Sequence, residues 1–518
     1  MKIFLDTDVL IDATIWADEY PHSLNLLNQL IDDPDFSLWI SAISLIKMDA
    51  IGSSAGAKQK AQDLFNLIRE NFSIIPFRKS TFLRAAGLDG GDFEYRVQMA
   101  SAKEFQVDVI VSRHPENFGN NGIPAWTPAQ FLKKWDGGEL DHTVNVPFLD
   151  LKAQHHQIYN EIDDRVTDII TNTGFILGKY VDEFERHFAK LQGARYCLGL
   201  SSGTAALHVA LLALGIGPGD GVIVPVNTFI ATAEAVSLTG AMPVFVDCDE
   251  LYNLDVSRLE DTLRQKVRGN HRLKAVIPVH LYGQPAEMAG IIQLATEYGL
   301  KVVEDCCQAH LARYGDKLVG NFGEFGAFSF YPGKNLGAYG EAGALITNQE
   351  ELYLKAKMIR QHGETRRYYH CVIGHNYRME AIQGAVLSAK LKYLEEWTKR
   401  RRDNARLYRE LLDGVEGVRT PGEIENASCV YHLYVIQAED RDGLQAYLHQ
   451  KGIGTGLHYP IPLHLQEAYR GLGYREGDFP MAERAAKRVL SLPMFPELSE
   501  RQIRYVCGKI KEYVADSG

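Results

Sequence analysis

The sequence predicts an α/β protein of two domains, and three observations support this prediction. The chain has 518 residues, which is too long for one ordinary hydrophobic core. Short apolar runs alternate with segments of helical periodicity, the pattern of parallel strands joined by helical crossovers. A polar, glycine-containing stretch, residues 136–145, interrupts this alternation. We therefore expect a small domain at residues 1–135, a linker, and a larger α/β unit from residue 146.

The composition excludes several classes of partner. A hydrophobic content of 46% and a charged content of 23% are those of a soluble globular protein. The net charge of -11 and the pI of about 5.9 argue against general affinity for nucleic acid or anionic membrane. No apolar run reaches the roughly 18 residues of a membrane span, and the first residues lack a signal-peptide pattern. Seven scattered cysteines suit a reducing compartment, so we expect a cytoplasmic protein.

The first domain is predicted to be a small parallel α/β sandwich. Asp8 and Asp12 are expected to precede a helix. The expected strands are residues 2–5, 37–41, 73–76, 108–112 and 124–126, and the expected helices are residues 22–31, 43–51, 58–71, 92–105 and 128–134.

Five stretches of this domain resemble the PIN nuclease family: residues 4–12, 40–45, 91–94, 108–113 and 126–132. The resemblance implies acidic side chains that hold Mg²⁺ or Mn²⁺ at one edge of the sheet. Asp6 matches the first of them. The other matching positions hold Lys47, Tyr95 and His114.

An amine at a ligand position opposes metal binding, so the domain is expected to keep the fold, without a metal site or nuclease activity. Asp49 and Glu94 lie close enough in sequence to leave open a metal-dependent ribonuclease, with the second domain as its scaffold. The acids could also simply cap helices and solvate a surface.

From residue 146 the chain is predicted to form a large domain, residues 146–398, and a small α+β domain, residues 399–518. Seven near-continuous apolar strands predict a mostly parallel sheet that is buried on both faces. These strands are residues 196–200, 222–226, 244–247, 275–279, 302–305, 325–330 and 344–347. The basic run Lys399, Arg400, Arg401 and Arg402 is interpreted as a solvated helix face.

One lysine stands out in the large domain. Lys334 follows an apolar strand and a Pro332-Gly333 turn, inside a glycine-rich loop. A lysine at the end of a buried strand loses solvation, so its amine can be neutral and nucleophilic near neutral pH. Schiff-base chemistry requires such an amine.

Two further stretches contain groups that could bind a cofactor. Residues 201–207 place hydroxyls and a glycine between a strand and a helix, which is either a phosphate site or a plain helix cap. Residues 303–310 end a strand in two acids, with Gln308 one turn later. Asp305 could there pair with a protonated ring nitrogen, or it could cap a helix.

These stretches occur in one order with Asn227–Thr232 and Gly374–Arg378, and together they resemble the DegT/DnrJ/EryC1/StrS family of pyridoxal-phosphate-dependent sugar aminotransferases. The resemblance runs from about residue 146 to the C-terminus. It implies the type I aminotransferase fold and a homodimer with shared active sites.

The resemblance also implies a role for each matching residue. Lys334 would bind the cofactor covalently and move the proton, and Asp305 would hold the pyridine nitrogen protonated. Gln308 would contact the ring hydroxyl, and Phe229 would stack on the ring. The cofactor's phosphate would be bound by Ser202, Gly203, Thr204 and Ser329, with Asn376 of the partner subunit.

The implied reaction transfers an amino group from an amino acid, expected to be L-glutamate, to a keto sugar. The resemblance favours C3 of a dTDP- or UDP-linked hexose, for amino sugars of a surface polysaccharide or a glycosylated metabolite. Dehydratases of the family have histidine in place of Lys334, so the dehydratase alternative is disfavoured. The expected substrate contacts are Tyr331 and, from the proline-rich stretch 458–466, His458, Tyr459 and His464.

Overall fold

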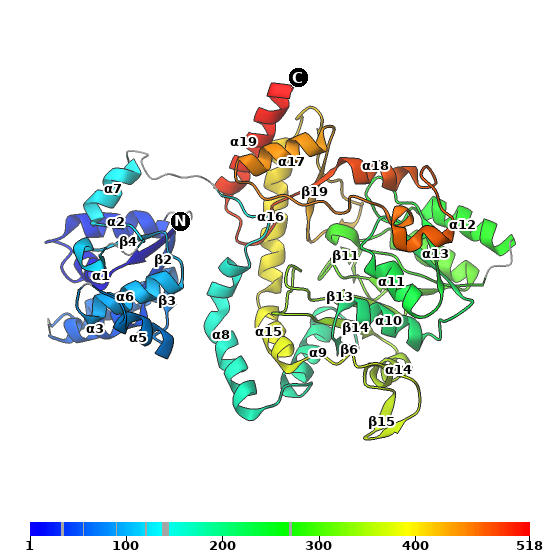
Figure 1. The fold of residues 1–518 in the computed structure, drawn as a ribbon, viewed down its shortest axis with the longest axis horizontal. Helices are drawn as coiled ribbons and strands as arrows, with labels where there is room; N and C mark the ends of the chain where they lie inside the picture. Colours follow the sequence, from blue (N-terminus) through cyan, green and yellow to red (C-terminus); the bar gives the residue numbers. More distant parts are fainter. Residues whose placement is uncertain are drawn as a thin grey trace. The chain divides into compact units, whose positions relative to one another are not determined.

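The computed structural model describes residues 1–32, 36–54, 56–89, 91–119, 122–136, 145–268 and 272–517 (Figure 1). The chain forms two compact units, Met1–Thr143 and Val144–Gly518. Residues 137–144 of the predicted linker lie outside the described residues.

The first unit contains a five-stranded sheet in which every pair is parallel, as the alternation of strands and helices predicts. β1 lies at its centre and is buried against helices on both faces. In sheet order the strands are β3 (Phe72–Ile75), β2 (Ser37–Ser41), β1 (Lys2–Leu5), β4 (Val109–Val111) and β5 (Ala125–Trp126).

The helices of this unit include two that the sequence pattern did not reveal. Asp8 and Asp12 lie within α1 and not ahead of it. The sequence pattern did not reveal this helix because Thr7–Ala13 are all buried, so the helix shows no polar face. α5 was missed because its Phe82 and Leu83 are exposed. The helices are α1 (Thr7–Thr14), α2 (Pro21–Asp32), α3 (Ala42–Ser54), α4 (Lys58–Asn71), α5 (Lys79–Ala86), α6 (Phe93–Glu104), η1 (Pro115–Phe118) and α7 (Pro128–Asp136).

The second unit contains the seven-stranded sheet that the apolar runs predict. β14 is antiparallel to both of its neighbours, and the remaining pairs are parallel. In sheet order the strands are β6 (Tyr196–Leu200), β14 (Gly343–Thr347), β13 (Phe325–Ser329), β10 (Lys301–Asp305), β9 (Leu273–Val276), β7 (Gly221–Pro225) and β8 (Met242–Val246). Nearly every side chain of these strands is buried, which explains their continuous apolar runs.

Helices cover both faces of this sheet. α10 (Gly203–Ala213) is buried on nearly all sides, because it packs between β13, β14 and the helices α11 and α14. The other helices are α8 (Leu151–Asn172), α9 (Lys179–Leu191), α11 (Ala231–Leu238), α12 (Val256–Arg268), η2 (Leu281–Gly283), α13 (Met288–Tyr298), α14 (Glu350–Arg360) and α15 (Ala381–Leu391). Two short pairings are added by β11 (Arg313–Tyr314), β12 (Lys317–Leu318) and β18 (Ala427–Ser428), and by β15 (Glu364–Arg366) and β16 (Tyr369–His370).

The C-terminal part of the second unit has its own antiparallel sheet and its own core (Figure 1). The long helix α16 (Leu394–Leu412) leads into it. The sheet consists of β17 (Val418–Arg419), β19 (Tyr434–Ala438) and β20 (Val489–Leu492), and the helices are α17 (Arg441–Gln450), η3 (Leu463–Leu465), η4 (Glu467–Leu472), α18 (Pro480–Arg488) and α19 (Glu500–Ser517).

The basic run on α16 corrects one interpretation. Arg401 is only 3% exposed, and its guanidinium donates to the carbonyl oxygens of Tyr431, His432 and Met494. Arg402 donates to the carbonyl oxygen of Cys429. These two residues are therefore not part of a solvated face, because two chain segments, residues 429–432 and Met494, place backbone carbonyl oxygens beside this helix.

Among the described helices, none combines the length and the apolar composition that crossing a bilayer requires.

Candidate functional site

Several of the predicted cofactor residues lie at one edge of the seven-stranded sheet. β10 ends at Asp305 and β13 ends at Ser329, and Asp305 pairs with Ala327 in the parallel register. Ser329 lies opposite Gly343 of β14, which in turn pairs with Leu200 at the end of β6. Residues far apart in the sequence therefore reach the same edge.

The turn between β6 and α10 needs glycine at position 203. A Cβ atom there would lie 2.7 Å from Cβ of Ser329 and 2.9 Å from Sγ of Cys307. Ser202 caps α10, because its Oγ accepts from the backbone N–H of Ala205 at 3.0 Å. The first turn of a helix leaves N–H groups without intrahelical partners, and these attract a phosphate. Thr204 follows in this same turn.

Asp305 is held as a hydrogen-bond acceptor. Its Oδ2 accepts from Oγ1 of Thr232 at 2.8 Å, and its Oδ1 accepts from the backbone N–H of Cys307 at 3.1 Å. The carboxylate is nearly buried. Thr232 lies in the stretch Asn227–Thr232 that the sequence singled out, but sequence reasoning gave it no role.

Gln308 is oriented by two contacts. Its Oε1 accepts from the backbone N–H of Tyr282 at 2.7 Å, which leaves its Nε2 as the donor. The Nε2 donates to the hydroxyl of Tyr459 at 3.1 Å. The Tyr459 ring lies 5.8 Å from that of Phe229, which is 54% exposed. Nothing in the local sequence pointed to Tyr282.

Tyr282 also connects this group to His458. Its hydroxyl donates to the carbonyl oxygen of His458. Nδ1 of His458 lies 2.8 Å from Oγ of Ser491, and its ring stacks on Phe148 at 5.8 Å. The structure therefore brings His458 and Tyr459 to the residues around Gln308.

Lys334 sits in a turn after β13, where its N–H donates to the carbonyl oxygen of Tyr331 at 2.8 Å. Burial lowers the pKa of its ammonium, and the nearby Cys307 and Asp305 oppose that shift. The amine is therefore more easily deprotonated than an exposed lysine, as Schiff-base chemistry requires.

Histidines near Lys334 are held neutral. Burial and then the charge of Lys334 lower the pKa of His458 to about 4 and that of His310 to about 3. The same two causes lower the pKa of His432 far below its ordinary value. Sequence reasoning gave His310 no role, although it ends the stretch 303–310, and it missed His432, which belongs to none of the stretches that it used.

Three predicted residues have a different surrounding. Tyr331 is 54% exposed, and Asn376 is exposed beside Gln361. His464 is buried in η3, where its Nε2 lies 2.9 Å from Oε1 of Glu483. Its ring packs on that of Phe479, and its described contacts do not include the residues around Lys334.

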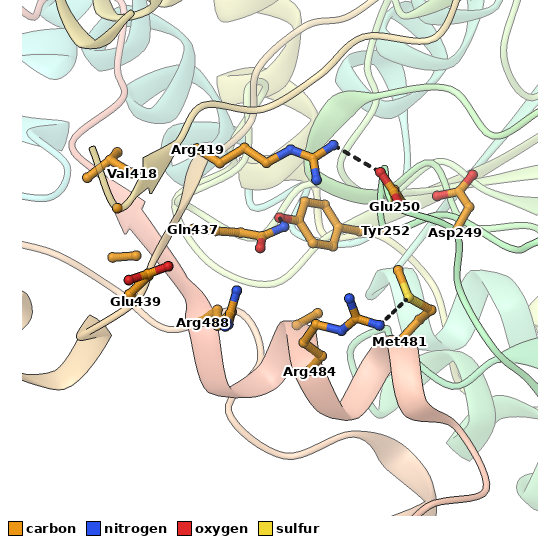
Figure 2. A pocket seen from close by; sticks show the side chains of 13 residues that line it. Asp249, Glu250, Tyr252, Val418, Arg419, Gln437, Glu439, Met481, Arg484 and Arg488 are labelled. Carbon is orange, nitrogen blue, oxygen red and sulfur yellow. Dashed lines mark hydrogen bonds and ion pairs between the residues drawn. The ribbon is translucent and has the colours of Figure 1, made fainter. Parts of the chain in front are cut away.

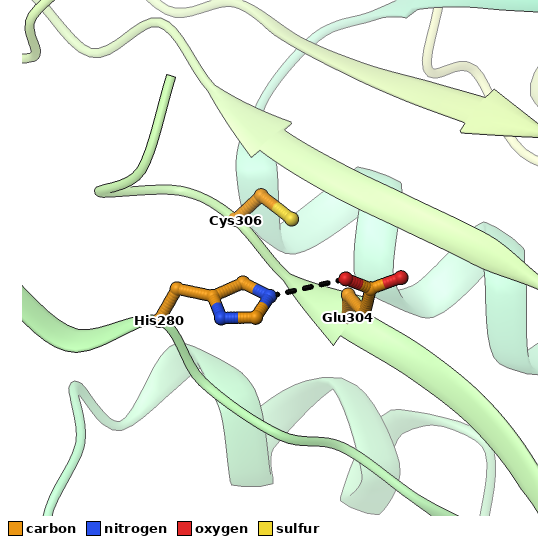
Figure 3. Close-up of side chains that lie close together, drawn as sticks. All are labelled: His280, Glu304 and Cys306. Atoms are coloured by element: carbon orange, nitrogen blue, oxygen red, sulfur yellow. Dashed lines mark hydrogen bonds and ion pairs between the residues drawn. The ribbon is translucent and has the colours of Figure 1, made fainter. Parts of the chain in front are cut away.

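A buried group behind the site could be mistaken for a metal centre (Figure 3). Among the described residues, His280, Glu304 and Cys306 are the only three potential ligands within 4.8 Å of one another. The Glu304 carboxylate already accepts from Nε2 of His280 and from the N–H groups of residues 320, 322 and 323. Nδ1 of His280 accepts from the N–H of Ala286 at 3.0 Å. The ligand atoms of His280 and Glu304 are therefore already engaged in hydrogen bonds, and these bonds fix the end of β10.

The first unit gathers acids and bases at the end of β1. Nζ of Lys47 lies 3.0 Å from Oδ1 of Asp8 and 3.2 Å from Oε1 of Glu94. Nη1 of Arg113 lies 2.9 Å from Oδ1 of Asp12. Two side-chain cations therefore occupy the space between three carboxylates.

The other residues that the PIN resemblance singled out differ in their surroundings. The Tyr95 hydroxyl donates to Asp8 at 3.3 Å, and burial raises the pKa of Asp6 and of Asp12 to about 6. His114 is half-buried and its Nδ1 lies 3.2 Å from Oε1 of Glu116, whereas Asp49 is exposed. Arg113, which sequence reasoning did not single out, is the second cation of the cluster.

Comparison with known proteins concerns the second unit. Residues 156–511 match the DegT/DnrJ/EryC1/StrS aminotransferase family. The chain is 46% identical over 373 residues to the pleiotropic regulatory protein of Geobacillus stearothermophilus. This match covers 71% of this chain and 99% of that protein. It is 42% identical over 373 residues to UDP-N-acetyl-3-dehydro-alpha-D-glucosamine 3-aminotransferase of Acidithiobacillus ferrooxidans. This second match covers 72% of this chain and 99% of that protein.

A solved structure shows the same fold. The crystal structure of S. venezuelae DesV in complex with a ketimine intermediate superimposes with a TM-score of 0.69 at 41% identity, and the match covers 71% of this chain and 98% of that one. The family match begins at residue 156, so the first unit lies outside it.

Proposed function

The chain belongs to the DegT/DnrJ/EryC1/StrS aminotransferase family, and from this premise we propose which of its residues carry out amino transfer. Its second unit has the mixed α/β aminotransferase fold. The enzyme transfers an amino group to a keto group of a nucleotide-linked sugar, and its curated relatives include named transaminases of such sugars. Neither a sugar dehydratase nor a ribonuclease with a scaffold domain finds support among these relatives.

The lysine in the turn after β13 supports the site assignment most directly. Lys334 has an environment that lowers the pKa of its amine, and it lies beside Asp305 and Cys307. A neutral amine at this place can attack a carbonyl carbon and can afterwards accept and return a proton. Lys334 is therefore the catalytic residue of the proposed reaction.

Pyridoxal 5'-phosphate is the proposed cofactor, because the residues present fit it. The open first turn of α10 at Ser202, Gly203 and Thr204, together with Ser329, suits a phosphate. One solved structure of similar fold holds the aminated form, pyridoxamine phosphate. When bound, the cofactor supplies an electron-withdrawing ring that stores the amino group between the two halves of the reaction.

The surrounding residues then position this chemistry. Asp305, fixed by Thr232, offers a carboxylate to a ring N–H and keeps that proton in place. Gln308 presents its Nε2 as a donor to a ring oxygen, and Phe229 offers an exposed ring face for stacking. Neutral His458 and His432 add no positive charge that would compete with Lys334.

The acceptor is proposed to be the C3 keto group of a dTDP- or UDP-linked hexose, and the donor to be L-glutamate. Named relatives act at the 3-position of dTDP- and of UDP-linked sugars, which supports this choice of carbon. Tyr331, His458 and Tyr459 are the proposed substrate contacts. The buried His464, paired with Glu483, has less capacity to reach a sugar.

A homodimer with shared active sites is also proposed. The segment that carries Asn376 exposes a group of large apolar side chains: Tyr368 at 77%, Val372 at 46% and Ile373 at 93%. Such a group favours burial against another protein surface. Light scattering should give a dimer for the wild type and a monomer for Ile373→Glu, whereas Leu354→Glu, exposed on α14, should remain a dimer. A dimeric Ile373→Glu variant would exclude this interface.

Replacement of Lys334 tests the main proposal. Lys334→Ala should lose the visible absorbance of bound pyridoxal phosphate and all amino transfer to a 3-keto nucleotide sugar. Lys357→Ala, which removes an exposed lysine of α14, should keep both. Amino transfer that survives in Lys334→Ala would refute the assignment.

For the first unit we propose a PIN-like fold without nuclease activity. The parallel five-stranded sheet and the place of Asp6 at the end of β1 support the fold. The ammonium of Lys47 lies between Asp8 and Glu94, where a divalent cation would need those oxygens. Mn²⁺-stimulated cleavage of RNA by the full chain would refute this proposal. We further propose that the unit supports dimer contacts or tethers a partner. The proposed cytoplasmic location stays a prediction.

A further inference from the structure

A cavity of about 300 Å³ lies in the second unit (Figure 2). It shares no lining residue with the site around Lys334. Three parts of the chain form it: the loop after β8, the strands β17 and β19, and the helix α18. Its polar lining residues are Asp249, Glu250, Tyr252, Arg419, Gln437, Glu439, Arg484 and Arg488.

One wall of this cavity is cationic. Arg484 and Arg488 stand one turn apart on α18 and extend toward Tyr252 and Gln437 (Figure 2). Two like charges at this spacing repel each other on a helix. Within the described part of the chain neither guanidinium forms an ion pair, and the contact of Arg484 is with Sδ of Met481 at 3.3 Å. A pair of free guanidinium groups is suited to a phosphate, which both can bind through paired N–H donors.

The opposite wall offers neutral and acceptor groups. Arg419 is neutralised by Glu250 at 3.0 Å, so it adds little to the field of the cavity. The Tyr252 hydroxyl accepts from Nε2 of Gln437 at 2.7 Å, which fixes an aromatic ring and an amide side by side. Glu439 adds a carboxylate that forms no ion pair with any of the described residues. Carboxylates oppose a bare anion, but they accept hydrogen bonds from hydroxyl groups.

We propose that this cavity binds a monosaccharide phosphate. Its phosphate lies on Arg484 and Arg488, and its hydroxyl groups donate to Glu439 and contact the Gln437 amide. The volume is at the lower end of the range of about 300–1,000 Å³ that small-molecule sites occupy, which suits a single sugar ring with one phosphate.

The floor of the cavity connects it to the catalytic site. The ring of Tyr252 packs edge-on against that of Tyr282 at 5.6 Å. Tyr282 in turn bonds His458 and Gln308. A ligand that contacts Tyr252 therefore acts on Tyr282, which holds His458 and Gln308 of the catalytic site. The same ligand would connect the C-terminal part to the loop after β8.

Calorimetric titration of the full-length holoenzyme with glucose 1-phosphate tests the proposal. The wild type should bind one equivalent per chain in this cavity. Arg484→Ala/Arg488→Ala should weaken binding at least tenfold, with the melting temperature and basal amino transfer unchanged. The matched control is Lys487→Ala, which removes a charge from the same helix but none from the cavity, and it should bind like the wild type.

Two further titrations identify the ligand class. Glucose and inorganic phosphate should each bind at least tenfold more weakly than glucose 1-phosphate. Equal affinity for inorganic phosphate would overturn the sugar assignment. The site itself would be overturned by no binding to the wild type, by undiminished binding to the double variant, or by an equal loss in Lys487→Ala. If the double variant melts early, Arg488→Gln alone takes its place and should weaken binding at least threefold.

Discussion

Replacing Asp6 by Asn tests whether the acidic cluster of the first unit is an internal charge balance or a metal site. Asp6 is fully buried at the end of β1. Burial, with a smaller contribution from the charge of Asp8, raises the pKa of its carboxyl from 3.8 to about 6. The hydrogen bond from Oγ of Ser112 to Oδ2, at 2.5 Å, only partly offsets this. The folded protein therefore tolerates the charged form of Asp6 poorly.

The pKa shift sets the size and the sign of the expected effect. A shift of about two units corresponds to about 3 kcal/mol. Because the folded state holds the proton more tightly, this contribution to stability is present below about pH 4 and is lost as the pH rises to about 6. Asn cannot ionise, so Asp6→Asn should be more stable than the wild type by up to about 3 kcal/mol at pH 7 and about equally stable at pH 4.

Tryptophan fluorescence can follow this transition in the full chain. Four of the five tryptophans lie in the first unit, at positions 16, 39, 126 and 135. Urea unfolding near pH 4 and pH 7 would compare the wild type, Asp6→Asn and a control, Asp49→Asn, whose exposed side chain should change little. A less stable Asp6→Asn at pH 7, or stabilisation by Mn²⁺ that only the wild type shows, would refute the reasoning and indicate a metal ligand.

The remaining predictions concern the second unit. Thr232→Val removes the hydroxyl that bonds Asp305 and should lower kcat/KM about 10- to 100-fold, whereas Thr232→Ser should keep most activity; equal activity of both would remove Thr232 from the site. Arg401→Met leaves three carbonyl oxygens without their donor and should lower the free energy of unfolding by about 3 kcal/mol, measured by urea, against less than about 0.5 for the exposed Arg400→Met. The ligand atoms of His280 and Glu304 are already engaged in hydrogen bonds, so EDTA should change neither activity nor melting temperature, and a loss of either on chelation would contradict this. Glu304→Gln should lower the melting temperature, because it disturbs these hydrogen bonds.

The strands were the part of the fold that the sequence predicted best. The seven strands of the large sheet are buried on both faces, so each appears as a continuous apolar run, and the prediction of a mostly parallel seven-stranded sheet is confirmed. The pattern of burial also explains why two helices, α1 and α5, were not predicted. α1 is buried along its whole length and shows no periodicity, and α5 exposes apolar side chains, so hydrophobic periodicity indicated neither helix.

The site could be predicted only where its residues belong to short motifs. Asp305, Gln308 and Lys334 follow strand ends, where turn residues and polar groups stand out against apolar runs. Tyr282 and His432 reach the same place from segments that look ordinary in sequence, and only the tertiary fold brings them there. The interpretation of Arg401 failed for the converse reason. Lys399 and Arg400 before it are exposed, whereas the carbonyl partners of Arg401 lie about 30 to 93 residues away in sequence.

The adjacent acids Glu304 and Asp305 show what the fold adds to such a motif. The sequence treats them alike, as two carboxylates at a strand end. Successive residues of a strand point to opposite faces. Glu304 therefore turns to the loop 320–323 and is satisfied by three backbone N–H groups and His280, while Asp305 turns to Thr232 and the edge that holds Lys334. The backbone N–H of His280 also donates to the carbonyl oxygen of Asp305 at 3.0 Å. Glu304 thus anchors the strand end that presents Asp305. The position of Asp305 therefore depends on the Glu304 carboxylate, which does not face the site.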